Sequence, residues 1–343
     1  MKTKELIPLL SEYFTTWLPE VKGVSKNTIT SYKYAFQLLF EFTREVKGIP
    51  VEKVTFSNLA NGVVTEFLSW LELKRNCTAV TRNQRRTALV SFAKYAAKKA
   101  FKESLAFYSE IACVPVKKTR KVNDIKYFTK EEITCLLNLP DTTKKIGRRD
   151  AVLLSVLYAS GARAQEICDL TVNDITFGAT ATLRFVGKGC KAREVVIPDN
   201  CASLLQKYLK YRHLNPSDVN DRKKYVFSSQ THEKMTLSCV EEIVKKYIVK
   251  AKAAWPTLFK RKSYSPHSFR HSIAVHMLEC GESLVVIKAF LGHESIETTT
   301  IYAEVTPELA NRYLKERGNP LADVEIKNSQ SNNFPTFLKV NGR

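Results

Sequence analysis

Apolar residues in the first 112 positions recur at α-helical spacing, and this pattern limits the possible folds more than any other feature. One stripe consists of Ile29, Tyr32, Phe36, Leu39 and Phe40. These residues fall at i, i+3, i+7, i+10 and i+11, behind Ser25, a residue type that caps helices. Similar stripes occur over residues 6–18, 63–73 and 89–96. We therefore expect a helical domain over residues 1–113, built from about four or five short helices.

A basic segment without apolar periodicity follows this domain. Residues 114–126 contain Pro115 and a cluster of cationic side chains at Lys117, Lys118, Arg120 and Lys121. Proline and the missing stripe favour an extended chain, and the charge suits a position near phosphates. We expect residues 114–126 to be a linker between two domains.

The second domain mixes helical patterns with one β-type pattern. Helical spacing occurs over residues 130–139, 149–160, 201–212, 237–254, 268–280, 284–291 and 296–314. Strand patterns over 181–186 and 193–197 flank a Gly-Lys-Gly turn, which predicts a hairpin. The expected fold class is mainly α (α+β), with a small antiparallel sheet. The end of the chain, 319–343, combines a polar stretch with apolar residues from Phe334 to Val340, which is typical of a flexible docking arm.

The formal net charge of +20 predicts a polyanionic partner. Residues 1–120 hold 20 basic and 10 acidic side chains, and the remainder holds 34 and 24, so both parts would face the polyanion. Nucleic acid is the first candidate, and a ribosome-associated basic protein is the rival interpretation. The eight cysteines show no zinc-type spacing, and no export signal or membrane-spanning run is found, so we expect a cytoplasmic protein with reduced thiols.

The segment from Ser265 to His271 suits an anion. Ser265 can cap a helix, and Pro266 fits its first turn, which places His267, Arg270 and His271 on one face near the N-terminus. Free N–H groups and the helix dipole favour a phosphate there. A solvated basic face is the plain alternative. Zinc binding is not expected, because Ser268 stands where the HExxH motif has glutamate.

Three sequence blocks, in a fixed order, resemble the tyrosine recombinase family, which includes phage integrases, Xer-type enzymes and transposon integrases. They are G-x-R-x-x-E at 161–166, H-x-x-R-H at 267–271, and L-G-H at 291–293 followed nine residues later by Tyr302. The resemblance covers about residues 127–318, which implies a recombinase catalytic domain. The helical first domain is similar to the family's SAM-like core-binding domain, and the two domains are expected to form a clamp around DNA.

The resemblance implies a role for each matching residue. Arg163 and Arg270 would hold the scissile phosphate, which planar guanidinium groups suit, with Glu166 supporting Arg163. Lys188 would protonate the leaving 5′ oxygen, and Lys191 is the alternative for that role.

Tyr302 would attack the phosphorus and form a 3′-phosphotyrosyl link. A free phenol has a pKa of about 10, so it needs a proton acceptor. The resemblance assigns that role to His267, and it makes His293 a hydrogen-bond donor to the phosphate. As a plain alternative, Tyr302 is one of fourteen tyrosines and packs in a core.

The implied activity is site-specific strand cleavage and rejoining without cofactor or metal. The sequence has neither a GxxxxGK[ST] loop nor a carboxylate cluster for magnesium. The alternatives are a type IB topoisomerase and a DNA-binding accessory protein that does not cut. Three residues in these blocks differ from those most frequent in the family: Ala162, Gln165 and Phe269.

Double-stranded DNA is the expected partner, and a nucleoid-associated location follows from it. The resemblance implies a tetramer on two DNA sites, with a dimer on each, and accessory proteins as optional partners. Expected phosphate contacts are Arg82, Arg85, Arg86, Lys117, Lys118, Arg120, Lys121 and Lys191.

Overall fold

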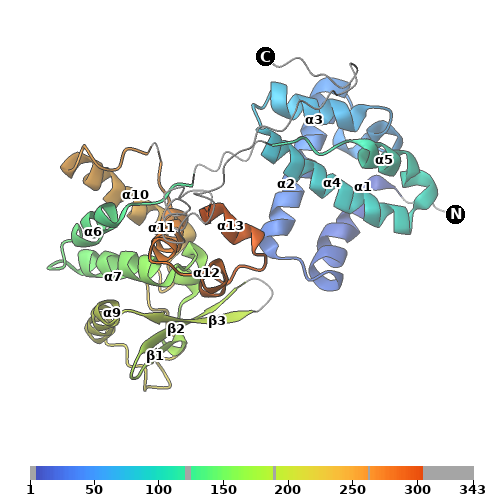
Figure 1. Ribbon diagram of the computed structural model, residues 1–343. Coiled ribbons are helices and arrows are strands. Elements are labelled where there is room, and N and C mark those ends of the chain that lie inside the picture. Colours follow the sequence, from blue (N-terminus) through green and yellow to red (C-terminus); the bar gives the residue numbers. More distant parts are fainter. Residues whose placement is uncertain (1–4, 120–124, 188–190, 262, 304–343) are drawn as a thin grey trace, which may run out of the picture. The chain divides into compact units, whose positions relative to one another are not determined.

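The computed structural model describes residues 5–119, 125–187, 191–261 and 263–303, and it divides the chain into two compact units, 1–122 and 123–343 (Figure 1). The expected fold class, mainly helical with a small antiparallel sheet, is confirmed. Among the described residues, no helix is both long and apolar enough to cross a membrane.

The first unit is entirely helical in its described part. Its longer helices are α1 (Leu6–Glu12), α2 (Lys26–Lys47), α3 (Val63–Leu73), α4 (Ala79–Lys99) and α5 (Phe101–Cys113). A π-helix, η1 (Tyr13–Val21), continues α1, and two short 3-10 turns, η2 (Val51–Lys53) and η3 (Ser57–Leu59), precede α3. The stripe predicted for residues 6–18 is therefore divided between an α-helix and a π-helix.

Helix α2 shows how the local sequence sets this unit. The Ser25 side chain accepts a hydrogen bond from the Thr28 N–H, and Gly48 ends the helix with a φ of 68°. Phe36 and Leu39 of the predicted stripe are buried. Phe36 packs edge-on against Phe92 of α4, which also contacts aromatic rings from η1, α5 and the segment before η3. Aromatic packing thus holds these helices together.

The second unit is a helical body with a three-stranded sheet. Its helices are α6 (Lys130–Asn138), α7 (Lys145–Ser160), α8 (Ala164–Asp169), α9 (Asp199–Tyr211), α10 (Leu237–Ala254), α11 (Pro266–Glu279), α12 (Leu284–Leu291) and α13 (Glu297–Ala303), with a 3-10 turn η4 (Val172–Asp174). The strands β1 (Ile175–Phe177), β2 (Ala181–Val186) and β3 (Ala192–Ile197) pair antiparallel in sequence order. The predicted hairpin is β2–β3, and Leu183 pairs with Val195 on its buried face.

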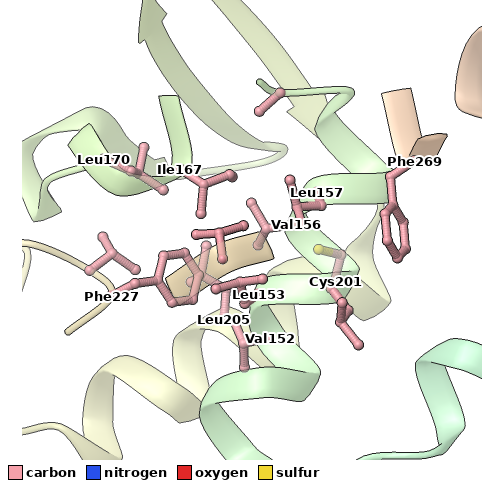
Figure 2. Close-up of a cluster of buried hydrophobic side chains, with 14 of the residues drawn as sticks. Val152, Leu153, Val156, Leu157, Ile167, Leu170, Cys201, Leu205, Phe227 and Phe269 are labelled. Atoms are coloured by element: carbon pink, nitrogen blue, oxygen red, sulfur yellow. The ribbon is translucent and has the colours of Figure 1, made fainter. Parts of the chain in front are cut away.

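Helix α7 passes through the main core of this unit (Figure 2). Val152, Leu153, Val156 and Leu157 are all buried, and side chains from α8, α9, α11 and the segment that holds Phe227 surround them. Because α7 is apolar on several faces, it anchors its neighbours on each side. Its C-terminus is thereby held rigidly at Gly161, where the first sequence block begins.

Gly161 ends α7 in a left-handed conformation, with a φ of 57°. A Cβ atom there would lie 2.9 Å from Leu291 Cδ2 and 3.1 Å from both Ile273 Cγ2 and Phe290 Cε1. Glycine is thus required for its backbone and for the close approach of α11 and α12.

We predict that Gly161→Ala destabilises the second unit more than Gly281→Ala does. Gly281 also has a positive φ, but its Cβ would meet nothing within 4 Å, so it reports backbone strain alone. The strain of alanine in a left-handed backbone conformation costs about 1–2 kcal/mol in either variant. Overpacking adds about 1–3 kcal/mol at position 161 alone. Urea unfolding of both variants measures the difference, and equal losses of free energy would contradict the packing argument.

Candidate active site

One buried guanidinium joins the three sequence blocks. Arg270, on the first turns of α11, is 0% exposed. Its Nη1 donates to the Gly161 carbonyl and its Nη2 to the Leu291 carbonyl, both at 2.6 Å. Gly161 begins the first block and Leu291 begins the third. Segments more than a hundred residues apart therefore meet at one side chain.

Arg270 lies in a strongly positive environment. Burial, followed by the charges of Arg163 and Arg193, lowers its pKa to about 10, so it stays charged at neutral pH. Its Nε is buried and has no hydrogen-bond partner among the described residues. A buried cation whose bonds go to neutral carbonyls favours a nearby anion.

Arg163 is the more accessible arginine of the site. It caps α8, and its backbone N–H donates to Glu166 Oε2 at 2.7 Å, while its Nη1 donates to Oε1 at 2.8 Å. Its side chain remains 41% exposed. The structure thus gives Glu166 the contact with Arg163 that the sequence predicts.

Glu166 also binds Arg193 on β3, a residue that the sequence analysis did not select. Both Nη groups of Arg193 donate to the carboxylate, at 2.9 and 2.8 Å. Burial raises the pKa of Glu166, but the hydrogen bonds and charges of Arg193 and Arg163 outweigh it and lower the pKa to about 2. No short motif marks Arg193, whose relation to Glu166 arises from the fold.

Three histidines of the site are held neutral. Burial and nearby cations lower the pKa of His271 to about 3 and that of His293 to about 4. His267 keeps an exposed edge, yet partial desolvation and the charges of Arg270 and Arg163 lower its pKa too. All three imidazoles are therefore neutral at pH 7, and an anion bound beside them would raise their pKa values by offsetting the positive charge.

Tyr302 lies on α13 and is 1% exposed. Its hydroxyl hydrogen-bonds with His271 Nδ1 at 3.1 Å, and its ring stacks with that of His293 at a centroid distance of 6.5 Å. Burial, opposed by Arg270 and Arg163, raises its pKa to about 12. The phenol is therefore protonated at neutral pH and lies next to a neutral imidazole.

His271 is a site residue that the sequence analysis placed on the right helix face but gave no role. Its spacing of four from His267 was the available signal, and the two rings lie 4.5 Å apart. His293, predicted to face the phosphate, has its Nδ1 bonded to Thr299 Oγ1 at 2.9 Å.

A cleft of about 490 Å³ borders this cluster. Its lining includes Arg163, Lys191, Arg193, His293 and Thr298. Lys191 is exposed at the end of the hairpin, where its carbonyl accepts a hydrogen bond from the Gly187 N–H at 2.8 Å. Lys188 lies outside the described residues. Within the described chain, no group of three His, Cys, Asp or Glu side chains could hold a metal ion.

The arginines predicted to contact DNA in the first unit have structural partners. Arg82 is 5% exposed and donates to the Pro115 carbonyl at 2.8 Å, and Arg86 donates to the Val114 carbonyl at 2.7 Å. Arg85 donates to the Ser31 carbonyl and lies over the Tyr34 ring. These bonds fix the segment after α5 and the side of α2.

The predicted linker cations are placed only in part. Lys117 and Lys118 are exposed, and Lys117 forms an ion pair with Glu72 at 2.7 Å. Arg120 and Lys121 lie outside the described residues.

Comparison with known proteins identifies the family. Residues 126–308, more than half of the chain, match the model of the phage integrase family, and residues 10–103 match its N-terminal SAM-like domain. The chain belongs to the phage integrase family of tyrosine recombinases. The resemblance seen in the sequence is thereby confirmed.

Named relatives and solved structures agree with this family. The chain is 32% identical to an integrase/recombinase of Sinorhizobium fredii, y4rC, over 98% of both chains. It is 29% identical to the tyrosine recombinase XerD of Haemophilus influenzae, over 93% of this chain and 99% of XerD.

Two solved recombinases show the same fold. The post-cleavage complex of the XerH site-specific recombinase with difH has a TM-score of 0.65 at 22% identity, covering 90% of this chain and 88% of XerH. A lambda integrase dimer on a core site has a TM-score of 0.59 at 15% identity, covering 94% and 100%. The tyrosine recombinase fold therefore extends over nearly all of the chain.

We predict that Glu166 stabilises this recombinase in a pH-dependent way. Its folded pKa of about 2 lies below the unfolded value of about 4.5, so its contribution is complete above pH 4.5 and is lost as the pH falls to 2. The contribution is up to about 3 kcal/mol.

Urea unfolding of the wild type and Glu166→Gln at several pH values tests this. The stability advantage of the wild type should shrink as the pH falls from 4.5 to 2. Glu194→Gln, at an exposed position of the same strand as Arg193, is the control and should show no such trend. A wild-type advantage that stays constant over that range would contradict the assigned contacts.

Proposed function

We propose that this tyrosine recombinase cuts and rejoins DNA at specific sites through a 3′-phosphotyrosyl intermediate on Tyr302. One observation carries the proposal: the Tyr302 hydroxyl hydrogen-bonds with His271, the residue next to Arg270, and the Arg270 guanidinium binds the residues that begin the first and third blocks. An isolated core tyrosine would not combine these neighbours.

The two arginines bind the scissile phosphate. Arg163 reaches it from the exposed side of the cluster, and Arg270 supplies a fixed charge from beneath. Negative charge accumulates on the phosphoryl oxygens during attack, and preorganised cations stabilise that transition state. His293, at the edge of the cleft, donates a further hydrogen bond.

The Tyr302 oxygen attacks the phosphorus, and the bond from phosphorus to the 5′ oxygen breaks. We assign the tyrosine proton first to His271, since its Nδ1 hydrogen-bonds with the hydroxyl; His267, the acceptor that the resemblance implies, lies beside it. A hairpin lysine, Lys188 or Lys191, donates a proton to the leaving 5′ oxygen.

Rejoining reverses these steps. A 5′ hydroxyl attacks the phosphotyrosine, a phosphodiester forms, and Tyr302 leaves with a proton. One phosphate ester is exchanged for another, so we propose that the reaction needs no nucleotide, metal or other cofactor. Membership of the recombinase family favours this activity over topoisomerase action or binding without cleavage.

The domains divide this work. We propose that residues 1–113 bind DNA, that 114–126 form a basic linker, and that 127–318 perform the chemistry, with both domains closing on the duplex as a clamp. The proposed phosphate contacts among the described residues are Arg85, Arg86, Lys117, Lys118 and Lys191. We assign no such contact to Arg82, because it is buried.

We further propose a dimer on each DNA site and a tetramer on two, with residues 319–343, outside the described part, as the docking arm. Solved relatives were captured on DNA, including the lambda integrase dimer on its core site. Accessory proteins remain optional in this scheme, and the enzyme acts on DNA in the cytoplasm, at the nucleoid.

Covalent capture tests the proposal. The wild type is incubated with a library of nicked duplexes of randomised sequence, and DNA that remains bound in denaturant is recovered and sequenced. We expect a recurrent site, and we expect Tyr302→Phe to form no adduct on it.

Tyr158→Phe is the matched control. The Tyr158 hydroxyl hydrogen-bonds with His276 Nδ1 at 2.9 Å, which is the same type of contact as that between Tyr302 and His271. Both histidines are on α11, but His276 lies outside the site. This control should form the adduct. No recovered DNA, or an adduct that survives Tyr302→Phe, would reject the proposed mechanism.

A further inference from the structure

Arg193 forms a closed contact with the carboxylate that supports Arg163. Its side chain is 10% exposed, and its two Nη groups bind the two Glu166 oxygens in parallel, a geometry that fixes both groups. The guanidinium also lies 5.0 Å from the centroid of the Phe185 ring on β2. Arg193 is therefore held in place by both its charge and its packing.

On another side, Arg193 contacts the turn that carries His293. A Cβ atom on Gly292 would lie 2.9 Å from Arg193 Cδ, so the turn's backbone passes directly against this side chain. Gly292 has a φ of 66° and ends α12. The same cleft is lined by Arg193, His293 and Lys191, the residue two positions earlier on the hairpin.

The sharing of Glu166 affects the charge that is available to a ligand. Glu166 accepts two side-chain hydrogen bonds from Arg193, whereas among the described contacts it accepts only one from the Arg163 side chain, from Nη1. Without Arg193, the whole carboxylate would neutralise Arg163. With Arg193 in place, the Nε and Nη2 of Arg163 can serve a phosphate.

We propose that Arg193 is a positioning residue for strand cleavage. It holds Glu166 so that Arg163 faces the phosphate with much of its charge uncompensated, and it fixes the hairpin against the His293 turn. It touches no reacting atom. This inference rests on the proposed function and adds to it a residue that joins the hairpin, the first block and the third block.

The test measures single-turnover cleavage of the duplex that the wild type captures from the randomised library. We expect Arg193→Gln to lower the cleavage rate constant about 10- to 100-fold, by analogy with the loss found when the hydrogen-bond partners of metal-binding side chains are removed. Binding of the same duplex should change little. Arg193→Lys keeps the charge but loses the paired hydrogen bonds, so its rate constant should lie between those of the wild type and Arg193→Gln.

A double-mutant cycle separates positioning from general stability. If Arg193 acts through Glu166, the double variant Arg193→Gln/Glu166→Gln should cleave no more slowly than the slower single variant. A protein that merely folds poorly would lose reaction amplitude and keep its rate constant. Arg184→Gln, an exposed arginine on neighbouring β2, is the control and should cleave at the wild-type rate.

The outcomes distinguish the two claims. Failure of the wild type to capture any DNA would reject the proposed function, and this inference with it. Wild-type capture with an unchanged rate constant for Arg193→Gln, or with fully additive losses in the double variant, would overturn the role of Arg193 alone.

Discussion

The organisation of the second unit depends on the buried guanidinium of Arg270. Its two Nη groups bind the carbonyls of Gly161 and Leu291, which brings the end of α7, the start of α11 and the end of α12 together. A charged group is costly to bury, and neutral carbonyls compensate that cost only in part. Arg270 is buried at the point where Gly161, which has no side chain, allows α11 and α12 to approach the end of α7 closely.

The remaining electrostatics follow from that placement. Arg163, Arg193 and Arg270 are gathered around a single buried carboxylate, Glu166, so the described part of the site carries excess positive charge. Desolvation and this positive charge keep His271 and His293 neutral, whereas desolvation keeps the Tyr302 phenol protonated against the opposing charges of Arg270 and Arg163. The excess positive charge favours binding of an anion, and a phosphodiester is such an anion. The phenol must lose its proton before it can attack, and a neutral imidazole lies beside it to accept that proton.

Much of the fold could be predicted from apolar spacing. Helices α3, α10 and α12 begin and end at the predicted residues, because their stripes are long or sharply bounded. The π-helix after α1 was not predicted, since its stripe looks like that of an α-helix. The short elements α8 and β1 have too few residues to show a period, and tertiary packing forms them.

The candidate site also contains residues that the sequence could identify and residues that it could not. Arg163, Arg270, His293 and Tyr302 could be selected because they occur in recognisable blocks, and the fold brings those blocks together. Arg193 could not be selected, since its partner Glu166 lies 27 residues earlier and is reached only through the hairpin. Arg82 was predicted to contact a phosphate because it is basic. In the structure it is buried and donates a hydrogen bond to the carbonyl of Pro115, 33 residues away, a contact that the sequence does not reveal.

Identification of the residue that carries DNA tests the central claim most directly. The covalent complex of the wild-type protein is digested with protease and nuclease, and the peptide that bears a nucleotide is sequenced by mass spectrometry. We predict a nucleotide joined through its 3′ phosphate to Tyr302. A nucleotide on any other residue would contradict the arrangement around Arg270 as the source of the activity, and one joined through a 5′ phosphate would contradict the proposed intermediate.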